Sequence, residues 1–368
     1  MSDSNSRYSR QVILPGFGPA AQQRLRDARV LVVGAGGLGS PASLYLAAAG
    51  VGTLGLADFD TVAEHNLQRQ ILHTTAAIGQ PKLKSATRTL KAINPEVTVK
   101  PIPEGLTTGN ALALAQHYDL IVDGTDNFPA RYLANDAARL SGKPLVHGSI
   151  FQYEGQITVL QPGAACYRCL FPNLPEPGAV PNCDEAGVLG ALCGVVGSFM
   201  AMEAIKLIAR IGEPLVNRLL RIDADLARTA QVQLRPSTEC PLCGPNPSIT
   251  TINPANYQFM CPTQTPDALP LETDIADADN WPADALFLDV REPDERATAV
   301  IEPSHFLPLG QLPDHFDALP RNRRLVVYCH HGMRSLRAAM FLRDNGFHLA
   351  QSLKGGIDAW SRLKDPSV

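Results

Sequence analysis

A glycine-rich turn directly after a buried apolar run is the feature that most restricts how this chain can fold. The segment Val30–Gly39 reads V-L-V-V-G-A-G-G-L-G. Such a run predicts a buried strand, and the glycines allow a tight turn whose backbone N–H groups can hold phosphate at the start of a helix. Asp58 stands 19 residues after Gly39, at the end of the next apolar run, where a ribose-binding carboxylate is needed. The pattern predicts a nucleotide site.

Apolar strands alternate with helical stretches over residues 29–150, which is typical of a parallel, doubly wound α/β sheet. Proline at the first turn predicts two of the helices, over 81–94 and 129–142. Gly155–Leu160 predicts an added antiparallel strand. The parallel strands are expected at Val30–Val33, Thr53–Ala57, Val97–Pro101, Leu120–Asp123 and Leu145–Gly148.

The last part of the chain repeats this alternation on a smaller scale. Leu286–Val290 and Leu325–Tyr328 predict short strands, and Ser335–Asn345 predicts an amphipathic helix that ends at Gly346. A proline-rich stretch before them is typical of a linker. We therefore expect a Rossmann-like domain over 1–248, a linker over 249–282 and a small α/β domain over 283–368.

Composition restricts the partners and the compartment. The net charge of −4 argues against nucleic acid or an anionic membrane as the main partner. No apolar core follows the charged residues at the N-terminus, so we expect neither a secretory signal nor a transit peptide, and a cytoplasmic location. The uncharged segment Val188–Met202 is shorter than the roughly 20 residues that cross a bilayer, and it predicts a buried core helix.

Eight cysteines in a reducing compartment indicate metal binding or thiol chemistry rather than disulfides. Four of them form two C-x-x-C pairs, Cys166 with Cys169 and Cys240 with Cys243. Four thiolates suit a closed, structural, tetrahedral zinc site. A redox-active dithiol at either pair is the alternative, although no thioredoxin-like βαβ pattern surrounds them.

Cys329 stands at the junction of a buried strand and a tight loop, C-H-H-G-M-R-S, after which a helix begins. A thiol at this junction faces backbone N–H groups and the positive end of the helix, and Arg334 adds a cation. These groups favour thiolate and persulfide anions. The alternative is a buried cysteine at a strand end that takes no part in chemistry.

Six motifs occur in order from residue 7 onward and together resemble the family of MoeB and ThiF, bacterial relatives of the ubiquitin-activating enzymes. They are R-Y-S-R-Q at 7–11, G-A-G-G-L-G at 34–39, D-F-D at 58–60, N-L-Q-R-Q at 66–70, G-Q-P-K at 79–82 and D-G-T-D-N at 123–127. Members of this family adenylate the C-terminal glycine of a small ubiquitin-like sulfur carrier. The resemblance implies ATP with magnesium as cofactor, and a homodimer.

The resemblance also implies the residues that carry this chemistry. Arg69 and Lys82 can neutralise a triphosphate, and Asp126 can hold magnesium. Arg10 is implied to reach into the site of the partner subunit. A peptide carboxylate is already ionised at pH 7, so we expect no catalytic histidine in this half. The nucleotide site is expected to include Gly34, Gly36, Gly37, Gly39, Asp58, Asn66, Arg69, Lys82, Asp126 and Asn127.

Cys183 is a further candidate, in a segment that predicts a loop before the apolar helix. In several members of the family the cysteine at this place forms a thioester or persulfide link to the carrier, and in others it is dispensable. The acidic neighbours Asp184 and Glu185 disfavour a thiolate. A covalent role and an inert role both remain open. The family resemblance agrees with zinc at the four paired cysteines.

Residues 283–363 resemble a single rhodanese domain. The resemblance rests on L-D-V-R-E at 288–292, on the loop at 329–335 and on L-K-G-G-I-D-A-W at 353–360. It implies that Cys329 carries persulfide sulfur.

Together the two resemblances predict an adenylyltransferase fused to a sulfurtransferase, like the MoeB–rhodanese fusions of the MoeZ type that serve molybdenum cofactor biosynthesis. A carrier ending in Gly-Gly would be adenylated, and a Cys329 persulfide would then convert it into a thiocarboxylate. A cysteine desulfurase or thiosulfate would supply the sulfur. The alternatives are an NAD-dependent oxidoreductase with a regulatory rhodanese-like module, and a non-catalytic scaffold for a ubiquitin-like protein. The sequence leaves the carrier and its pathway open.

Overall fold

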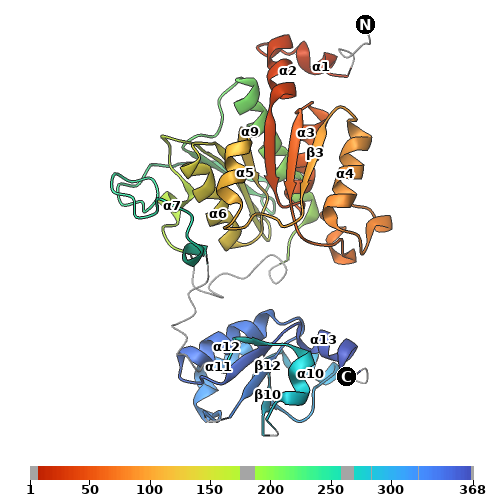
Figure 1. Cartoon of the computed structure of the whole chain (residues 1–368), viewed down its shortest axis with the longest axis vertical. Coiled ribbons are helices and arrows are strands. Elements are labelled where there is room, and N and C mark those ends of the chain that lie inside the picture. Colours follow the sequence, from red (N-terminus) through yellow and green to blue (C-terminus); the bar gives the residue numbers. More distant parts are fainter. Residues whose placement is uncertain (1–6, 175–186, 258–268, 283, 322, 366–368) are drawn as a thin grey trace. The chain divides into compact units, whose positions relative to one another are not determined.

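The chain divides into two compact units, residues 1–259 and 260–368, each with its own sheet (Figure 1). The structure is a computed structural model. It describes residues 7–174, 187–257, 269–282, 284–321 and 323–365.

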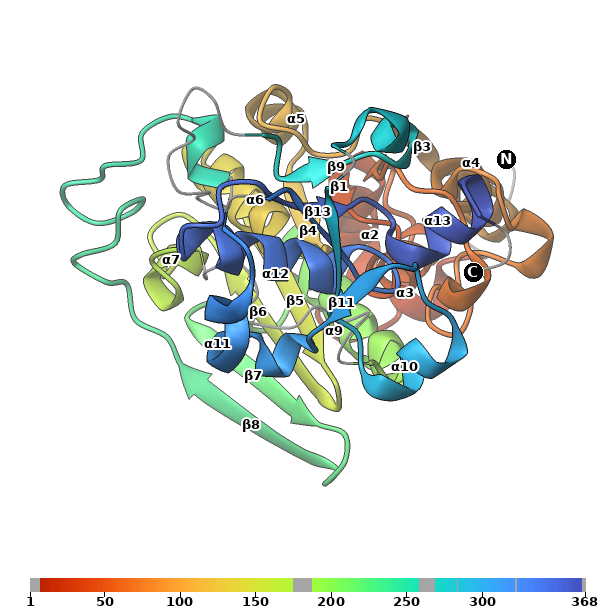
Figure 2. The same ribbon diagram turned by 90° about the horizontal axis from the view of Figure 1, so that it is seen from below.

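The first unit is built on an eight-stranded sheet with the order β3-β2-β1-β4-β5-β6-β7-β8. The first five strands of this order are parallel, and β6, β7 and β8 continue the sheet antiparallel, which puts β8 at its free edge (Figure 2). The predicted doubly wound sheet and the added antiparallel strand are confirmed. The bounds are β1 Arg29–Val33, β2 Thr53–Ala57, β3 Thr98–Ile102, β4 Leu120–Asp123, β5 Leu145–Phe151, β6 Glu154–Leu160, β7 Arg218–Asp223 and β8 Arg228–Gln233.

Helices cover both faces of this sheet. Along β1, Val30 and Val32 face a core shared with α2, α3, α4 and α9, whereas Leu31 and Val33 face a second core with α5 and α6. This period of two explains why β1 is apolar throughout, because both of its faces are buried. The helices are α1 Ser9–Val12, α2 Gly18–Asp27, α3 Gly39–Ala48, α4 Lys82–Ile93, α5 Ala111–His117, α6 Phe128–Leu140, α7 Tyr167–Leu170 and α9 Gly190–Ala209, with short 3-10 turns η1 Glu64–Asn66, η2 Thr75–Ala77 and η3 Pro254–Tyr257.

The apolar helix α9 is a core helix, as predicted. By length and composition it could cross a membrane. Instead it packs along α2 and α3 and against β5 and β6. Its side chains Leu192, Val196, Met200 and Ala204 are buried in the same core as β1. The hydrophobic composition of α9 is therefore explained by burial within the first unit.

The second unit is a five-stranded parallel sheet with the order β11-β10-β12-β13-β9. Leu325 and Val327 of β12 face a core with α12, while Val326 and Tyr328 face a core with α13. The bounds are β9 Glu272–Thr273, β10 Leu286–Asp289, β11 Ser304–Phe306, β12 Leu325–Tyr328, β13 Ala350–Leu353, α10 Pro293–Thr298, α11 Leu312–His315, α12 Met333–Asp344 and α13 Gly356–Leu363, with 3-10 turns η4 Ile275–Asn280, η5 Leu309–Gln311 and η6 Phe316–Ala318.

The range 249–282, expected to be a linker, contains regular structure at both ends. The turn η3 contacts α6 of the first unit. In the second unit β9 pairs in parallel with β13, and η4 contacts α13. The proline-rich range therefore includes regular structure and is not a linker along its whole length.

A buried ion pair joins α6 to the first C-x-x-C turn. Arg168 donates from Nε and Nη2 to the carboxylate of Asp136, with the closest approach at 2.7 Å, and both side chains are buried. Asn135 and the hydroxyl of Tyr257 also donate to this carboxylate. The Arg168 guanidinium lies over the ring of Tyr132 at 4.7 Å. The charge of Asp136 is therefore stabilised by partners from three separate segments.

Replacement of Arg168 by Met should lower the free energy of unfolding of the first unit by about 3–5 kcal/mol, because Asp136 would keep a buried charge without its partner. Both tryptophans, Trp281 and Trp360, lie in the second unit. Urea unfolding should therefore show an earlier transition in circular dichroism and an unchanged one in tryptophan fluorescence.

The matched control is Arg221→Met, which breaks a half-exposed pair with Glu154 and should cost less than about 1 kcal/mol. An equal loss of unfolding free energy in both variants would contradict the larger contribution expected from the buried pair.

Candidate nucleotide and thiol sites

Three glycines, at the ends of β1 and β4 and at the start of α3, touch through their backbones. A Cβ on Gly39 would overlap the carbonyl oxygen of Gly34, and one on Gly34 would lie 2.9 Å from the carbonyl oxygen of Gly124. No residue with a side chain fits there without displacing the backbone. These contacts bring the start of α3 to the point where the strand order reverses between β1 and β4, which is the usual ligand position in such a sheet.

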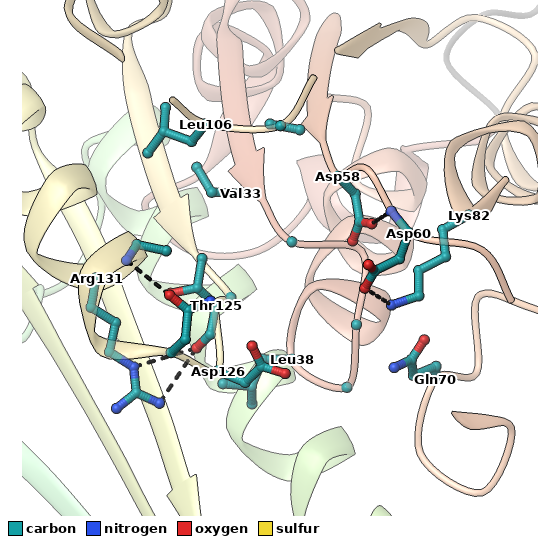
Figure 3. A pocket seen from close by; sticks show the side chains of 18 of the residues that line it. Val33, Leu38, Asp58, Asp60, Gln70, Lys82, Leu106, Thr125, Asp126 and Arg131 are labelled. Carbon is teal, nitrogen blue, oxygen red and sulfur yellow. Dashed lines mark hydrogen bonds and ion pairs between the residues drawn. The ribbon is translucent and has the colours of Figure 1, made fainter. Parts of the chain in front are cut away.

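A cleft opens at this point, between the turn after β1, the end of β2 and the turn after β4 (Figure 3). Gly39 does not line it, because it packs against Gly34. Asn66 also lies outside the lining, since its side-chain oxygen accepts a hydrogen bond from the backbone N–H of Ala63. The other residues expected at the nucleotide site all line the cleft: Gly34, Gly36, Gly37, Asp58, Arg69, Lys82, Asp126 and Asn127.

One wall of the cleft pairs a buried cation with acidic residues from the end of β2 (Figure 3). Lys82 is only 5% exposed, and its Nζ donates to Asp60 Oδ2 over 2.8 Å. Asp58 accepts hydrogen bonds from the backbone N–H groups of Ala35 and Asp60, at 2.7 and 2.9 Å. Lys82 is also the first residue of α4, where the helix dipole disfavours a cation. An anionic ligand in the cleft would relieve that cost.

The opposite wall is shaped by a buried carboxylate. Asp123 Oδ1 accepts from the backbone N–H and the hydroxyl of Thr125, and Oδ2 lies 2.8 Å from Nδ1 of His147. Burial alone would raise the pKa of Asp123, but the bonds from His147 and Thr125 hold the pKa below its ordinary value. The turn that follows β4 is thereby fixed, with Asp126 exposed in the cleft. The side chain of Asn127 caps α6 through the N–H of Ala130, 3.0 Å away.

Several residues of the cleft were not expected from the sequence. Asp60 and Gln70 belong to the D-F-D and N-L-Q-R-Q motifs, so those motifs could have indicated them. Arg131 lines the cleft from α6 and lies 3.4 Å from the carbonyl oxygen of Thr125. Cys193 reaches the cleft from α9, with its sulfur 3.0 Å from where a Cβ on Gly37 would lie. No local sequence signal connects α6 or α9 to the glycine-rich turn.

The four paired cysteines come together, as predicted for a metal site. Their sulfur atoms all lie within 4.8 Å of one another. The separation is 3.8 Å for Cys166–Cys169, 3.5 Å for Cys166–Cys240 and 3.3 Å for Cys169–Cys243. Tetrahedral zinc with bonds of about 2.3 Å needs sulfur atoms about 3.8 Å apart. The cluster is therefore compatible with zinc and, at these separations, contains no disulfide.

Further contacts support a set of thiolates at this cluster. The sulfur of Cys169 accepts from the backbone N–H groups of Cys166 and Ser237, and the sulfur of Cys240 accepts from the N–H of Cys243. Burial raises the pKa of the Cys166 thiol, and it raises the pKa of Cys243 to about 12. A bound cation would offset this burial cost, because metal ligation requires deprotonated thiols.

Two further residues, Arg10 and Cys183, were expected to take part in the chemistry. Arg10 is exposed on α1 and does not line the cleft of its own chain. Cys183 lies outside the described residues.

In the second unit Cys329 lies at the base of a loop between the N-termini of α12 and α13. The side chain is 2% exposed, and its sulfur accepts a hydrogen bond from the N–H of Gly332 at 3.2 Å. Ser335 Oγ lies 3.5 Å from the same sulfur. The carbonyl oxygens of Cys329 and His330 accept from the N–H groups of Ile357 and Asp358. The loop therefore places two hydrogen-bond donors, the N–H of Gly332 and the hydroxyl of Ser335, beside the thiol.

Comparison with known families identifies both units. The model of the ThiF family matches residues 8–242, and the model of the rhodanese-like domain matches residues 273–363. This chain belongs to the ThiF family. Its second unit is a rhodanese-like domain, so the predicted combination of domains is confirmed.

Named relatives match all or part of this chain. The chain is 43% identical to the probable adenylyltransferase/sulfurtransferase MoeZ of Mycobacterium tuberculosis, over 99% of this chain and 94% of that one. It is 42% identical to the adenylyltransferase and sulfurtransferase MOCS3-1 of Zea mays, over 99% and 83%. The sulfur carrier protein adenylyltransferase of Thermus thermophilus is 50% identical over 69% of this chain and 96% of its own length.

Among solved structures, the E. coli MccB complex with ATP is similar to the first unit. The TM-score is 0.58 at 24% identity, over 65% of this chain and 75% of that one. This similarity supports the ThiF-type fold.

If the four cysteines hold structural zinc, the purified chain should contain about one zinc ion per chain, and Cys240→Ser should lose it, because three thiolates leave the tetrahedron incomplete. Elemental analysis by mass spectrometry measures both. Cys193→Ser is the matched control, since Cys193 is equally buried but lies outside the cluster. Zinc retained in Cys240→Ser, or absent from the wild-type chain, would contradict the assignment.

Proposed function

We propose that the first unit uses ATP to adenylate the C-terminal glycine of a ubiquitin-like sulfur-carrier protein, and that Cys329 then transfers persulfide sulfur to that glycine as a thiocarboxylate. The observation that carries this proposal is the presence of a ThiF nucleotide cleft and a rhodanese thiol loop in one chain. Relatives that match almost the whole chain are named for both activities.

The cleft suits an attack by one anion on another. The carrier carboxylate is ionised at pH 7 and needs no base, so its main requirements are positioning and cations that reduce repulsion from the triphosphate. Lys82 and Arg69 supply cations at the cleft, and the N–H groups of the glycine-rich turn add donors. His73, below this turn, lies 3.0 Å from the carbonyl oxygen of Ala35, and burial lowers its pKa. It therefore stays neutral and serves as a structural contact.

Magnesium would neutralise phosphate charge when bound, and Asp126, an exposed carboxylate of the cleft, would hold it. The same proposal includes a homodimer in which Arg10 serves the neighbouring cleft, and a cytoplasmic location. It also includes a cysteine desulfurase or thiosulfate as the sulfur donor.

Sulfur transfer is a reaction between the carrier acyl-adenylate and the Cys329 persulfide. The terminal sulfur of the Cys329 persulfide anion attacks the acyl carbon, AMP leaves with the electron pair of the broken C–O bond, and an acyl disulfide forms. A thiol reductant supplying two electrons then cleaves the S–S bond, which releases the thiocarboxylate and the Cys329 thiol. Cys183 is a candidate to assist this cleavage.

The alternatives receive less support. Neither an NAD-dependent oxidoreductase nor a non-catalytic scaffold accounts for relatives named as adenylyltransferases and sulfurtransferases. A hydride-transfer enzyme also does not need a buried lysine such as Lys82 in its nucleotide cleft.

Lys82→Ala should reduce carrier-dependent ATP–pyrophosphate exchange by about 100-fold or more, because it removes a preorganised cation from the cleft. Sulfur transfer from thiosulfate to cyanide should remain unchanged. Lys84→Ala, an exposed position on the same helix, is the control and should retain exchange. Loss of both activities in Lys82→Ala would show that the two units do not act independently.

Cys329→Ala should have the opposite effect. Thiosulfate:cyanide transfer and thiocarboxylate formation should stop, since the persulfide sulfur would have no carrier, whereas ATP–pyrophosphate exchange should continue. Thiocarboxylate formed at the wild-type rate by this variant would leave the second unit without its proposed role.

A further inference from the structure

The cations around the Cys329 loop are paired with carboxylates inside the second unit. Arg291 forms a buried pair with Asp289, with the closest approach at 2.8 Å. Arg296 contacts Asp289 at 3.3 Å and Glu302 at 3.6 Å. Arg362 pairs with Asp358 at the start of α13. These arginines therefore bring little net positive charge to a ligand of the loop.

The side chain expected to add positive charge beside the thiol is itself neutralised. Arg334 stands next to Ser335, whose hydroxyl oxygen lies 3.5 Å from the sulfur. Its two terminal nitrogens donate to both oxygens of Glu295, at 2.6 and 2.5 Å. Hydrogen bonds from Arg334 lower the pKa of Glu295 to about 2, so this carboxylate stays charged throughout the neutral range. The pair contributes a dipole to the site rather than a net charge.

Two histidines of the loop are further candidates for positive charge. The rings of His330 and His331 stack with their centres 4.1 Å apart. Burial and the neighbouring ring lower the pKa of His330. His330 is therefore uncharged at pH 7. Nδ1 of His331 lies 3.4 Å from the carboxylate of Asp358, so a charge on this ring would also have an acidic partner.

We propose that Glu295 determines the class of sulfur donor, because its pairing with Arg334 removes the positive charge that a dianion such as thiosulfate would need and leaves a site suited to a persulfide carried on a thiol. This inference rests on the proposed role of Cys329 as the sulfur carrier. A persulfide R–S–SH presents at most one negative charge to the loop, and the N–H of Gly332 offers a donor to it.

The transfer step balances without an oxidant or a reductant. The Cys329 thiolate attacks the outer sulfur of R–S–SH, a new S–S bond forms to Cys329, and the donor S–S bond breaks. The donor thiolate leaves with that electron pair and takes the proton from the transferred sulfur. The products are a Cys329 persulfide anion and R–SH.

The test compares two small donors of similar shape and different charge, thiosulfate and methanethiosulfonate, with cyanide as acceptor and the full-length chain as enzyme. Glu295→Gln should lower the KM for thiosulfate by about three- to tenfold, since it frees one positive charge near the sulfur. The KM for the monoanion should fall by a smaller factor. High salt should reduce both effects. Gln at this position can keep the bond from the N–H of Glu292 that Glu295 accepts at the start of α10.

Arg334→Gln should act in the opposite direction and raise the KM for thiosulfate, because it leaves Glu295 unpaired. The double variant should return the KM close to the wild-type value, so the three variants form a thermodynamic cycle. The matched control is Asp317→Asn, which releases Arg321. Arg321 binds the carbonyl oxygen of Asn345 at the far end of α12, about 18 Å along the helix, so thiosulfate KM should not change.

The outcomes distinguish this inference from the proposed function. A KM for thiosulfate that is unchanged or raised in Glu295→Gln, with normal tryptophan fluorescence, would overturn the role of Glu295. If that variant does not fold, an unchanged KM in Arg334→Gln would overturn it equally. Sulfur transfer that persists in Cys329→Ala would instead remove the proposed function of the second unit.

Discussion

The backbone contact among Gly34, Gly39 and Gly124 is the constraint on which the first unit depends. It leaves no room for a Cβ, so β1, β4 and the start of α3 can meet at one point of the sheet. The turn after β1 then presents its N–H groups to the cleft, and Asp58 fastens it to the end of β2 through the N–H of Ala35. Asp123 fixes the turn after β4 in the same region. The glycine contact therefore brings together the two turns, after β1 and after β4, that line the nucleotide cleft.

Both sites pair a cation with a carboxylate, but the two pairs differ in geometry and exposure, and each agrees with its proposed ligand. In the cleft, Lys82 is buried at a helix N-terminus beside only a half-exposed carboxylate, Asp60, and this arrangement suits a highly charged phosphate ligand. At the thiol loop, Arg334 is paired through both of its terminal nitrogens with Glu295. That arrangement suits a sulfur group of low charge held by backbone N–H groups.

The sequence predicts features that depend on local pattern and misses those that depend on distant contacts. Strand β2 and the approach of the four cysteines follow from periodicity and spacing, and the structure agrees. Asn66 was expected in the cleft, but its amide caps a 3-10 turn instead. Cys193 lines the cleft because α9 packs against α3, which no nearby residue reveals. The structured ends of the range 249–282 were missed because their partners, on α6 and β13, lie far away in sequence.

The central claim is that a terminal glycine is activated as its acyl-adenylate before sulfur reaches it. The most direct measurement is the intact mass of a Gly-Gly carrier protein incubated with ATP and the full-length chain, first without and then with a sulfur source. The account predicts an AMP adduct in the first case and a thiocarboxylate in the second. A carrier mass that stays unchanged with every Gly-Gly carrier of the source organism, or a thiocarboxylate that forms without ATP, would contradict it.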